Sequence, residues 1–398
     1  MKKKNLIINI LLLIFALCLI VRTSCSSDGG NKENNIIDDN WETKPKLKYE
    51  VSFYNRSRFI DSQEVEEGLF VQRPDNPDDE EDSRFIGWYE NANFTKRFNF
   101  NTPIEKNINL YARYLNRSYI PIDEEFTFEA PIQGSNIFIE DEDGVRNITI
   151  PSMYVCDHET TQAEWFKYMK PYNLKTIGDE YPIYNVNWYE CIVYCNLRSE
   201  AEGLMPAYYI VIDGIENYDV YDWITYNDSY LEVDDEGKFS YTKNTASTFL
   251  DQIKCDISAN GYRIPTEAEW EFIARGGKNN DATYEPLENY AWYKLHGNSL
   301  HEVKQLEKNT LGVYDILGNV SEICYDRHGE ITSQTDIFGA EGLLCIRRGG
   351  CYTNDKTGTD RVNGIEYPTG CNITARGQPK APYTRSQYGG LRVICTAN

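Results

Sequence analysis

The chain has 398 residues, of which 41% are hydrophobic and 13% aromatic, enough for one large folded domain and a smaller one. Its 62 acidic and 40 basic residues give a formal net charge of -22. A charge of this sign and size excludes nucleic acid as a partner, because the phosphates would be repelled, and it disfavours adhesion to an anionic lipid surface.

Residues 1–24 are typical of a secretory signal. Three lysines precede an apolar run from Leu6 to Val21, which is too short for a comfortable membrane span. Cys25 follows, and the polar stretch after it cannot bury a core. The arrangement resembles a bacterial lipoprotein site, with Cys25 acylated and a flexible tether up to residue 47; a plain cleaved signal and an uncleaved anchor are the alternatives. All three place the chain in the cell envelope, on the outer surface or in the periplasm, and the lipid is the expected membrane contact.

The cysteines and histidines predict no catalytic metal centre. Of 11 cysteines, Cys18 leaves with the signal and Cys25 would carry the lipid, so an odd number remains. No pair has the C-x-x-C spacing of a zinc or redox site, and the four histidines form no H-x-x-H or H-x-H pattern.

The first folded module is expected at residues 48–114. Its two ends alternate apolar and polar residues, with Val51 and Phe53 in one segment and Leu110 and Ala112 in the other, as in half-buried strands.

The whole segment resembles the Listeria–Bacteroides B-repeat of bacterial surface proteins, through FIGWY at 85–89, FNFNTPI at 98–104 and LYARY at 110–114. The resemblance implies a small β-grasp fold that serves as a spacer or adhesion unit. We expect Trp88 in its core, because so small a module needs every large apolar side chain to close it.

A second domain is expected at residues 125–398. It contains, in order, RIPTEAEWE at 263–271, NTLGVYDILGNVSE at 309–322, IRRGGCY at 346–352 and GGLRVI at 389–394. These four segments resemble the motifs of the sulfatase-modifying-factor family, which includes the formylglycine-generating enzymes. The resemblance implies an irregular α+β domain of the C-type-lectin-like fold.

Local signals fix two helix starts in this domain. Thr160 or Thr161 can cap a helix that carries Trp165, and Thr266 stands at the start of a helix with acidic residues in its first turn. The insertion at 207–244 has no counterpart in the family and is interpreted as a decoration over the groove.

The family's catalytic cysteine positions are occupied by Asn354 and Thr359. Neither side chain forms a thiolate or binds copper(I) as a soft ligand. The favoured function is therefore a non-catalytic surface lipoprotein that binds a protein or glycan ligand outside the cytoplasm. The alternatives are a formylglycine-type oxidase that uses Cys351 or Cys371, and a structural envelope protein without a specific ligand.

The resemblance also implies a structural calcium ion and a disulfide. The positions of the calcium ligands hold Asp315, Gly318, Val320 and Glu322, and carboxylate plus carbonyl oxygen suits calcium, although an ordinary turn is the alternative. Some relatives carry a bridge at the positions of Cys195 and Cys395.

The expected contact surface is the stretch from 353 to 388 with the adjoining Tyr352, which is polar, rich in tyrosine and poor in aliphatic residues. Loops on a rigid scaffold often carry recognition, and such residues give adaptable contacts. A plain surface loop is the alternative, and Arg361, Arg376 and Arg392 could instead be buried framework arginines. The candidate contact residues are Tyr352, Asn354, Asp355, Asp360, Arg361, Tyr367, Tyr383, Arg385 and Tyr388.

Overall fold

The computed structural model describes residues 46–397 apart from 81, 172–173, 227–229, 244 and 363–364, and only the backbone at 360–362 and 365–368. The predicted signal, the predicted lipidation site Cys25 and nearly all of the predicted tether lie outside the described residues. Contacts group Leu47–Asn398 as one compact unit. In the part of the chain that is described, no helix has the length and apolar character needed to cross a membrane.

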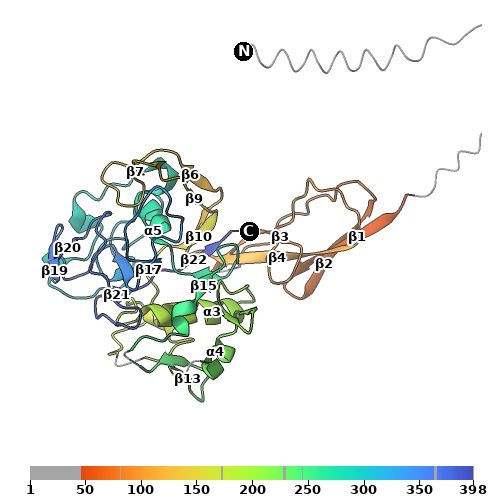
Figure 1. Ribbon diagram of the computed structural model, residues 1–398. Helices are drawn as coiled ribbons and strands as arrows, with labels where there is room; N and C mark the ends of the chain where they lie inside the picture. Colours follow the sequence, from red (N-terminus) through yellow and green to blue (C-terminus); the bar gives the residue numbers. More distant parts are fainter. Residues whose placement is uncertain are drawn as a thin grey trace, which may run out of the picture. The chain divides into compact units, whose positions relative to one another are not determined.

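The N-terminal part of this unit is a four-stranded mixed sheet (Figure 1). Its strand order is β2-β1-β4-β3, with β1 and β4 parallel at the centre and antiparallel strands outside, as in a β-grasp sheet. The strands are β1 (Lys48–Asn55), β2 (Arg58–Glu66), β3 (Ser83–Tyr89) and β4 (Ile108–Asn116).

The core of this sheet is built by its alternating apolar positions. Val51, Phe53 and Leu110 are fully buried, and Phe53 lies opposite Leu110 in the parallel register. Trp88 is 2% exposed and meets the Phe53 ring edge-on, with ring centroids 5.0 Å apart. The prediction that Trp88 is a core residue is confirmed.

The chain then forms a second four-stranded sheet in which distant segments meet. The order is β16-β22-β10-β5, so the C-terminal strand lies beside β10 near the sheet centre (Figure 1). The strands are β5 (Tyr119–Ile122), β10 (Met153–Cys156), β16 (Tyr262–Arg263) and β22 (Ile394–Thr396).

Three helices begin with the same local device, a capping box. A Thr or Asn side chain accepts from the third helical N–H, and the glutamate there accepts from the cap's own N–H. Thr161 caps α2 (Gln162–Trp165) and Thr266 caps α5 (Glu267–Ala274), so both predicted helix starts are confirmed. Asn187 caps α3 (Trp188–Ala201).

The expectation for the insertion at 207–244 is wrong. Its strands and helix bury Trp223, Phe239 and Tyr241 in the same core cluster as α3, because these large apolar side chains complete the packing around that helix. Its elements are β11 (Tyr208–Ile212), β12 (Ile215–Asn217), α4 (Val220–Tyr226), β13 (Leu231–Val233) and β14 (Phe239–Tyr241), and β15 (Lys254–Cys255) pairs with β11.

A three-stranded sheet of order β18-β17-β21 carries the region of the predicted contact surface. Its strands are β17 (Ser321–Arg327), β18 (Cys345–Arg348) and β21 (Gly389–Gly390). The remaining strands are β6 (Phe126–Phe128), β7 (Glu140–Asp141), β8 (Gly144–Val145), β9 (Ile148–Ile150), β19 (Thr359–Val362) and β20 (Ile365–Pro368). Few helices, many short strands and long irregular connections confirm the predicted α+β class.

Candidate functional site

A groove with a volume of about 570 Å³ lies at the β18-β17-β21 sheet. Strands supply one side of it, and the irregular chain between β20 and β21 supplies most of the rest. Its lining residues are Ser321, Arg347, Gly350, Cys351, Thr353, Asn354, Thr369, Ala375, Gly377, Gln378, Lys380, Thr384, Arg385, Ser386, Gln387 and Tyr388. We call this feature the groove.

Three of the candidate contact residues line the groove, namely Asn354, Arg385 and Tyr388. Tyr352 lies beside it, because its ring meets the Tyr388 ring at 5.6 Å between centroids. Burial, followed by the neighbouring Tyr388, raises the pKa of Tyr352 to about 12, so its hydroxyl stays protonated at neutral pH.

The other candidate contact residues are placed differently. Asp355 is exposed and pairs with Lys294 at 2.9 Å, while Tyr383 packs partly buried against the main core. The side chains of Asp360, Arg361 and Tyr367 are outside the description, although their backbone forms the β19-β20 hairpin.

Arg385 faces the groove but is largely committed to the framework. Its Nη2 donates to Glu190 Oε1 at 2.6 Å and to the Tyr241 carbonyl at 2.5 Å, and its side chain is 7% exposed. Glu190 also belongs to the capping box of α3, so this contact ties the groove to a helix start.

Asn354 and Thr359, which the sequence resemblance places at the family's two catalytic positions, contain no sulfur. Asn354 closes a local turn, because its Oδ1 accepts a hydrogen bond from the Cys351 backbone N–H at 2.9 Å. Thr359 is exposed at the start of β19.

The nearest thiols are those of Cys351 and Cys371. Cys351 lines the groove, and the Cys371 Sγ lies 3.5 Å from the Cys351 carbonyl oxygen. Burial and, second, Cys351 itself raise the pKa of the Cys371 thiol, which disfavours the thiolate that metal binding and nucleophilic attack require.

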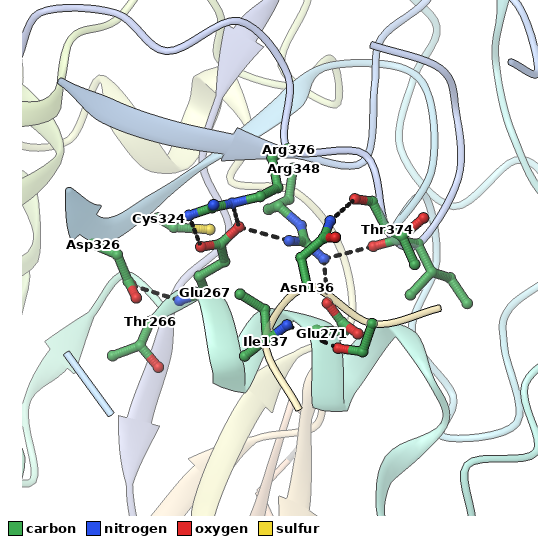
Figure 2. Close-up of polar contacts among 12 residues, drawn as sticks. Asn136, Ile137, Thr266, Glu267, Glu271, Cys324, Asp326, Arg348, Thr374 and Arg376 are labelled. Carbon is green, nitrogen blue, oxygen red and sulfur yellow. Dashed lines mark hydrogen bonds and ion pairs between the residues drawn. The ribbon is translucent and has the colours of Figure 1, made fainter. Parts of the chain in front are cut away.

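Buried ion pairs connect the chain that borders the groove to helix α5 (Figure 2). Glu267 Oε1 accepts from Arg348 Nη1 at 2.6 Å and from Arg376 Nε at 2.8 Å. Glu271 Oε2 accepts from Arg348 Nη2 at 2.6 Å, and the same nitrogen donates to the Ile373 carbonyl. Arg376 is therefore a framework residue, one of the two alternatives left open by the sequence.

The positions of the implied calcium ligands lie in a buried acidic cluster. Asp315, Glu322 and Glu159 are each at most 2% exposed, and Arg392 donates to Glu322 at 2.7 Å. Burial raises the pKa of Asp315 to about 6, although the Lys304 N–H and Arg392 oppose the rise. The cluster holds three carboxylates and one guanidinium, and the buried Asp315 Oδ1 has no hydrogen-bond partner among the described residues. Such a surplus of negative oxygen ligands fits a bound cation.

A second cluster joins Cys156, Asp157 and His158 within 4.8 Å. His158 Nδ1 lies 2.6 Å from Asp157 Oδ1, and its Nε2 lies 3.6 Å from Glu164 Oε2. Burial alone would lower the pKa of His158, but Cys156, Asp157 and Glu164 outweigh it and raise the pKa to about 12. With Lys304 also 2.9 Å from Asp157, the described contacts of this cluster form an ion-pair network.

The expected Cys195–Cys395 disulfide is not formed in the structure. Both residues are free, fully buried thiols. Burial raises the pKa of the Cys195 thiol, although the nearby Arg198 opposes the rise.

Sequence reasoning missed Arg347 as a groove residue. The motif IRRGG places two arginines next to each other, and consecutive side chains of a strand point to opposite faces. This signal could have shown that only Arg348 or Arg347, not both, enters the ion-pair network.

Comparison with known proteins places this geometry in a family. The model of the sulfatase-modifying factor enzyme 1-like domain matches residues 48–397. The chaperone protein LppX of Paenibacillus barcinonensis is 33% identical over 207 residues, which is 46% of this chain and 65% of the relative. The serine/threonine-protein kinase Pkn1 of Chlamydia trachomatis is 25% identical over 60% of this chain and 36% of the kinase.

The chain thus spans less than two thirds of the length of either curated relative. Among solved structures, Treponema denticola variable protein 1 is 25% identical, with a TM-score of 0.48 over 69% of this chain and 99% of that chain. Because the family model covers nearly all described residues, the chain belongs to the sulfatase-modifying factor enzyme 1-like family and has its C-type-lectin-like fold.

Proposed function

We propose that this protein is a non-catalytic binding protein whose groove takes a protein or glycan ligand outside the cytoplasm. The observation that carries the proposal is a polar groove lined by Asn354, and the sequence resemblance, which puts Asn354 and Thr359 at the family's two catalytic cysteine positions, supports it. Neither residue supplies redox or soft-metal chemistry. The curated relative from Paenibacillus barcinonensis is called a chaperone protein, and a chaperone acts by binding.

The lining of the groove suits recognition. Thr353, Gln378, Ser386 and Gln387 offer hydroxyl and amide groups that both donate and accept hydrogen bonds. Tyr388 adds an aromatic ring, a rigid contact area with little conformational entropy to lose. The ion pairs of Arg376 and Arg385 hold the walls before any ligand arrives, which lowers the cost of binding.

The experiment compares wild-type protein with the variant Thr353→Ala, Gln378→Ala, Tyr388→Ala on arrays of glycans and extracellular matrix proteins. The variant Tyr226→Ala, which removes an aromatic ring that is 49% exposed, is the matched control. We expect a ligand that binds wild type and the control but is lost from the groove variant. A ligand retained by the groove variant would place recognition elsewhere and refute the proposal.

A formylglycine-type oxidase is the second candidate, because Cys351 lines the groove beside Cys371. Such an enzyme would bind copper(I) tightly and oxidise the cysteine of a sulfatase peptide. The raised pKa of Cys371 argues against it. Turnover of the peptide that disappears in Cys351→Ser would establish the oxidase and remove the binding-only function.

We further propose an envelope location with acylated Cys25 as the anchor, and a B-repeat-like spacer at 48–114 ahead of a groove-bearing domain at 125–398. The mixed sheet with its parallel central pair supports the spacer. Incorporation of labelled palmitate that Cys25→Ser abolishes would support the anchor; a chain released without lipid would favour a plain cleaved signal. A structural envelope protein without ligand remains the outcome if no array component binds.

A calcium ion is proposed at Asp315 and Glu322, with the carbonyls of Gly318 and Val320 as further ligands. The unpartnered Asp315 Oδ1 and the surplus of buried negative charge support it. Calcium would neutralise part of this charge and stiffen the turn that leads into β17.

A further inference from the structure

The groove contains a buried cation whose charge no carboxylate of the described residues balances. Arg347 lies in β18, is 7% exposed and lines the groove. Its Nη2 donates to the Thr384 carbonyl at 3.0 Å, whereas its buried Nε has no hydrogen-bond partner. Burial lowers the pKa of Arg347, but a guanidinium stays charged at neutral pH. An unpaired buried charge is costly, so a ligand that neutralises it gains correspondingly.

Neighbouring arginines show what the groove lacks. Arg348, one residue along the strand, pairs with both Glu267 and Glu271 at 2.6 Å. Arg385, which also lines the groove, is neutralised by Glu190 at 2.6 Å. Arg348 and Arg385 are thus neutralised by glutamates of the fold. Among the described residues, Arg347 has no such carboxylate, so an anionic ligand could neutralise it.

The composition of the groove wall points to the same charge. The described lining residues include Arg347 and Lys380, together with Arg385, whose charge Glu190 balances, but no aspartate or glutamate. In a chain with 62 acidic and 40 basic residues, an acid-free cavity of this size is contrary to the composition. The nearby exposed carboxylate of Asp355 pairs outward with Lys294 at 2.9 Å. The groove therefore attracts an anion while the rest of the surface repels it.

The position of Arg347 is fixed by a close backbone approach. Its Nε lies 2.9 Å from where a Cβ at Gly389 would stand, so any larger residue there would displace the guanidinium. This contact leaves the planar group held against β21, with limited freedom to turn away. A held, planar guanidinium matches the two oxygens of a carboxylate.

We propose that the groove binds a sugar unit that carries a carboxylate, a uronic acid, with the carboxylate against Arg347. Gln378, Gln387, Thr353 and Ser386 provide donors and acceptors for its hydroxyl groups, and Tyr388 provides a ring for its apolar face. This assignment rests on the proposed binding function and names the class of ligand.

The test measures binding of a glucuronic-acid oligosaccharide and a glucose oligosaccharide of equal length to the full chain by calorimetry. We expect the acidic sugar to bind at least tenfold more tightly, and the difference to shrink in 1 M salt. Arg347→Gln should remove the tenfold preference and Arg347→Lys should keep part of it. Lys278→Gln removes an equal charge from a side chain that is 64% exposed and outside the groove, and should change nothing.

The wild-type comparison and its salt dependence keep the test valid if Arg347→Gln does not fold. Equal binding of acidic and neutral sugars, or a preference that Arg347→Gln retains, would overturn the inference while leaving the groove as a binding site. Binding of a glutamate-rich peptide in place of the acidic sugar would overturn the sugar assignment. Failure of the proposed binding function would be recognised differently: in the array experiment, no ligand would bind wild type and be lost from the groove variant.

Discussion

Replacement of Glu267 by glutamine should destabilise the protein strongly. The Glu267 carboxylate is fully buried and accepts three hydrogen bonds, one from Arg348 and two from Arg376. The amide keeps the shape but removes the charge, so Arg376 loses its ion pair with Glu267 and Arg348 keeps its ion pair with Glu271. Removing one member of a buried ion pair costs about 3–5 kcal/mol, because the other charge stays buried without compensation.

The pH dependence of this effect has a definite sign. Burial alone would raise the pKa of Glu267, but Arg348 and Arg376 outweigh it and hold the pKa below its usual value of 4.5. A carboxyl group with a lowered folded pKa stabilises above its unfolded pKa, and the contribution disappears as the pH falls through the folded pKa. The difference between wild type and Glu267→Gln should therefore be full at pH 7 and shrink below about pH 4.5.

Urea unfolding followed by tryptophan fluorescence measures this difference at pH 7 and at pH 4. The control Glu64→Gln breaks an exposed ion pair, in which the Glu64 side chain is 73% and the Lys48 side chain 56% exposed. It should cost less than about 1 kcal/mol of unfolding free energy. If Glu267→Gln costs no more than Glu64→Gln, the ion-pair network does not hold the groove, and the reasoning fails.

Three further predictions follow from single side chains. Trp88→Ala should lower the free energy of unfolding by about 3–5 kcal/mol, because it empties a packed site in the core. Trp88→Phe should cost much less, because it keeps a ring there and removes an indole N–H that has no partner among the described residues. Equal losses for the two variants in urea titrations would contradict the core position of Trp88. Calcium should raise the melting temperature of wild type over an EDTA-treated sample but not that of Asp315→Asn, and an equal rise in both would exclude the acidic cluster as its site. Glu200→Gln should be more stable than wild type at pH 8 and equal to it near pH 4. Burial and then Asp219 raise the pKa of Glu200 to about 7, so wild type loses stability as the pH rises through that value. Urea denaturation of both proteins at the two pH values measures the difference, and an equal difference at both would contradict the raised pKa.

The sequence predicted local structure well where the feature depends only on nearby residues, as in a helix cap or a core tryptophan. Thr161 and Thr266 each stand three residues before a glutamate, and this spacing alone specifies a capping box. Trp88 could be assigned to a core from module size alone. Neither inference needs to know what packs against the element.

Partners across long stretches of chain were beyond the sequence. Cys195 was expected to pair with Cys395, but the structure leaves them as separate thiols, and the ion pair that Arg385 makes with Glu190 was not foreseen. Arg385 and Glu190 are 195 positions apart, so which groups meet depends on the path of the chain between them. A one-residue shift in a strand also exchanges a buried side chain for an exposed one.

By itself, the sequence determined the class of the protein: its acidic composition, the helix starts and the α+β fold of the sulfatase-modifying factor enzyme 1-like family. Only the tertiary structure decided which of two adjacent arginines is neutralised. Arg348 meets two glutamates of α5 and Arg347 meets the groove, because side chains that follow each other on a strand face opposite ways into surroundings built from distant segments.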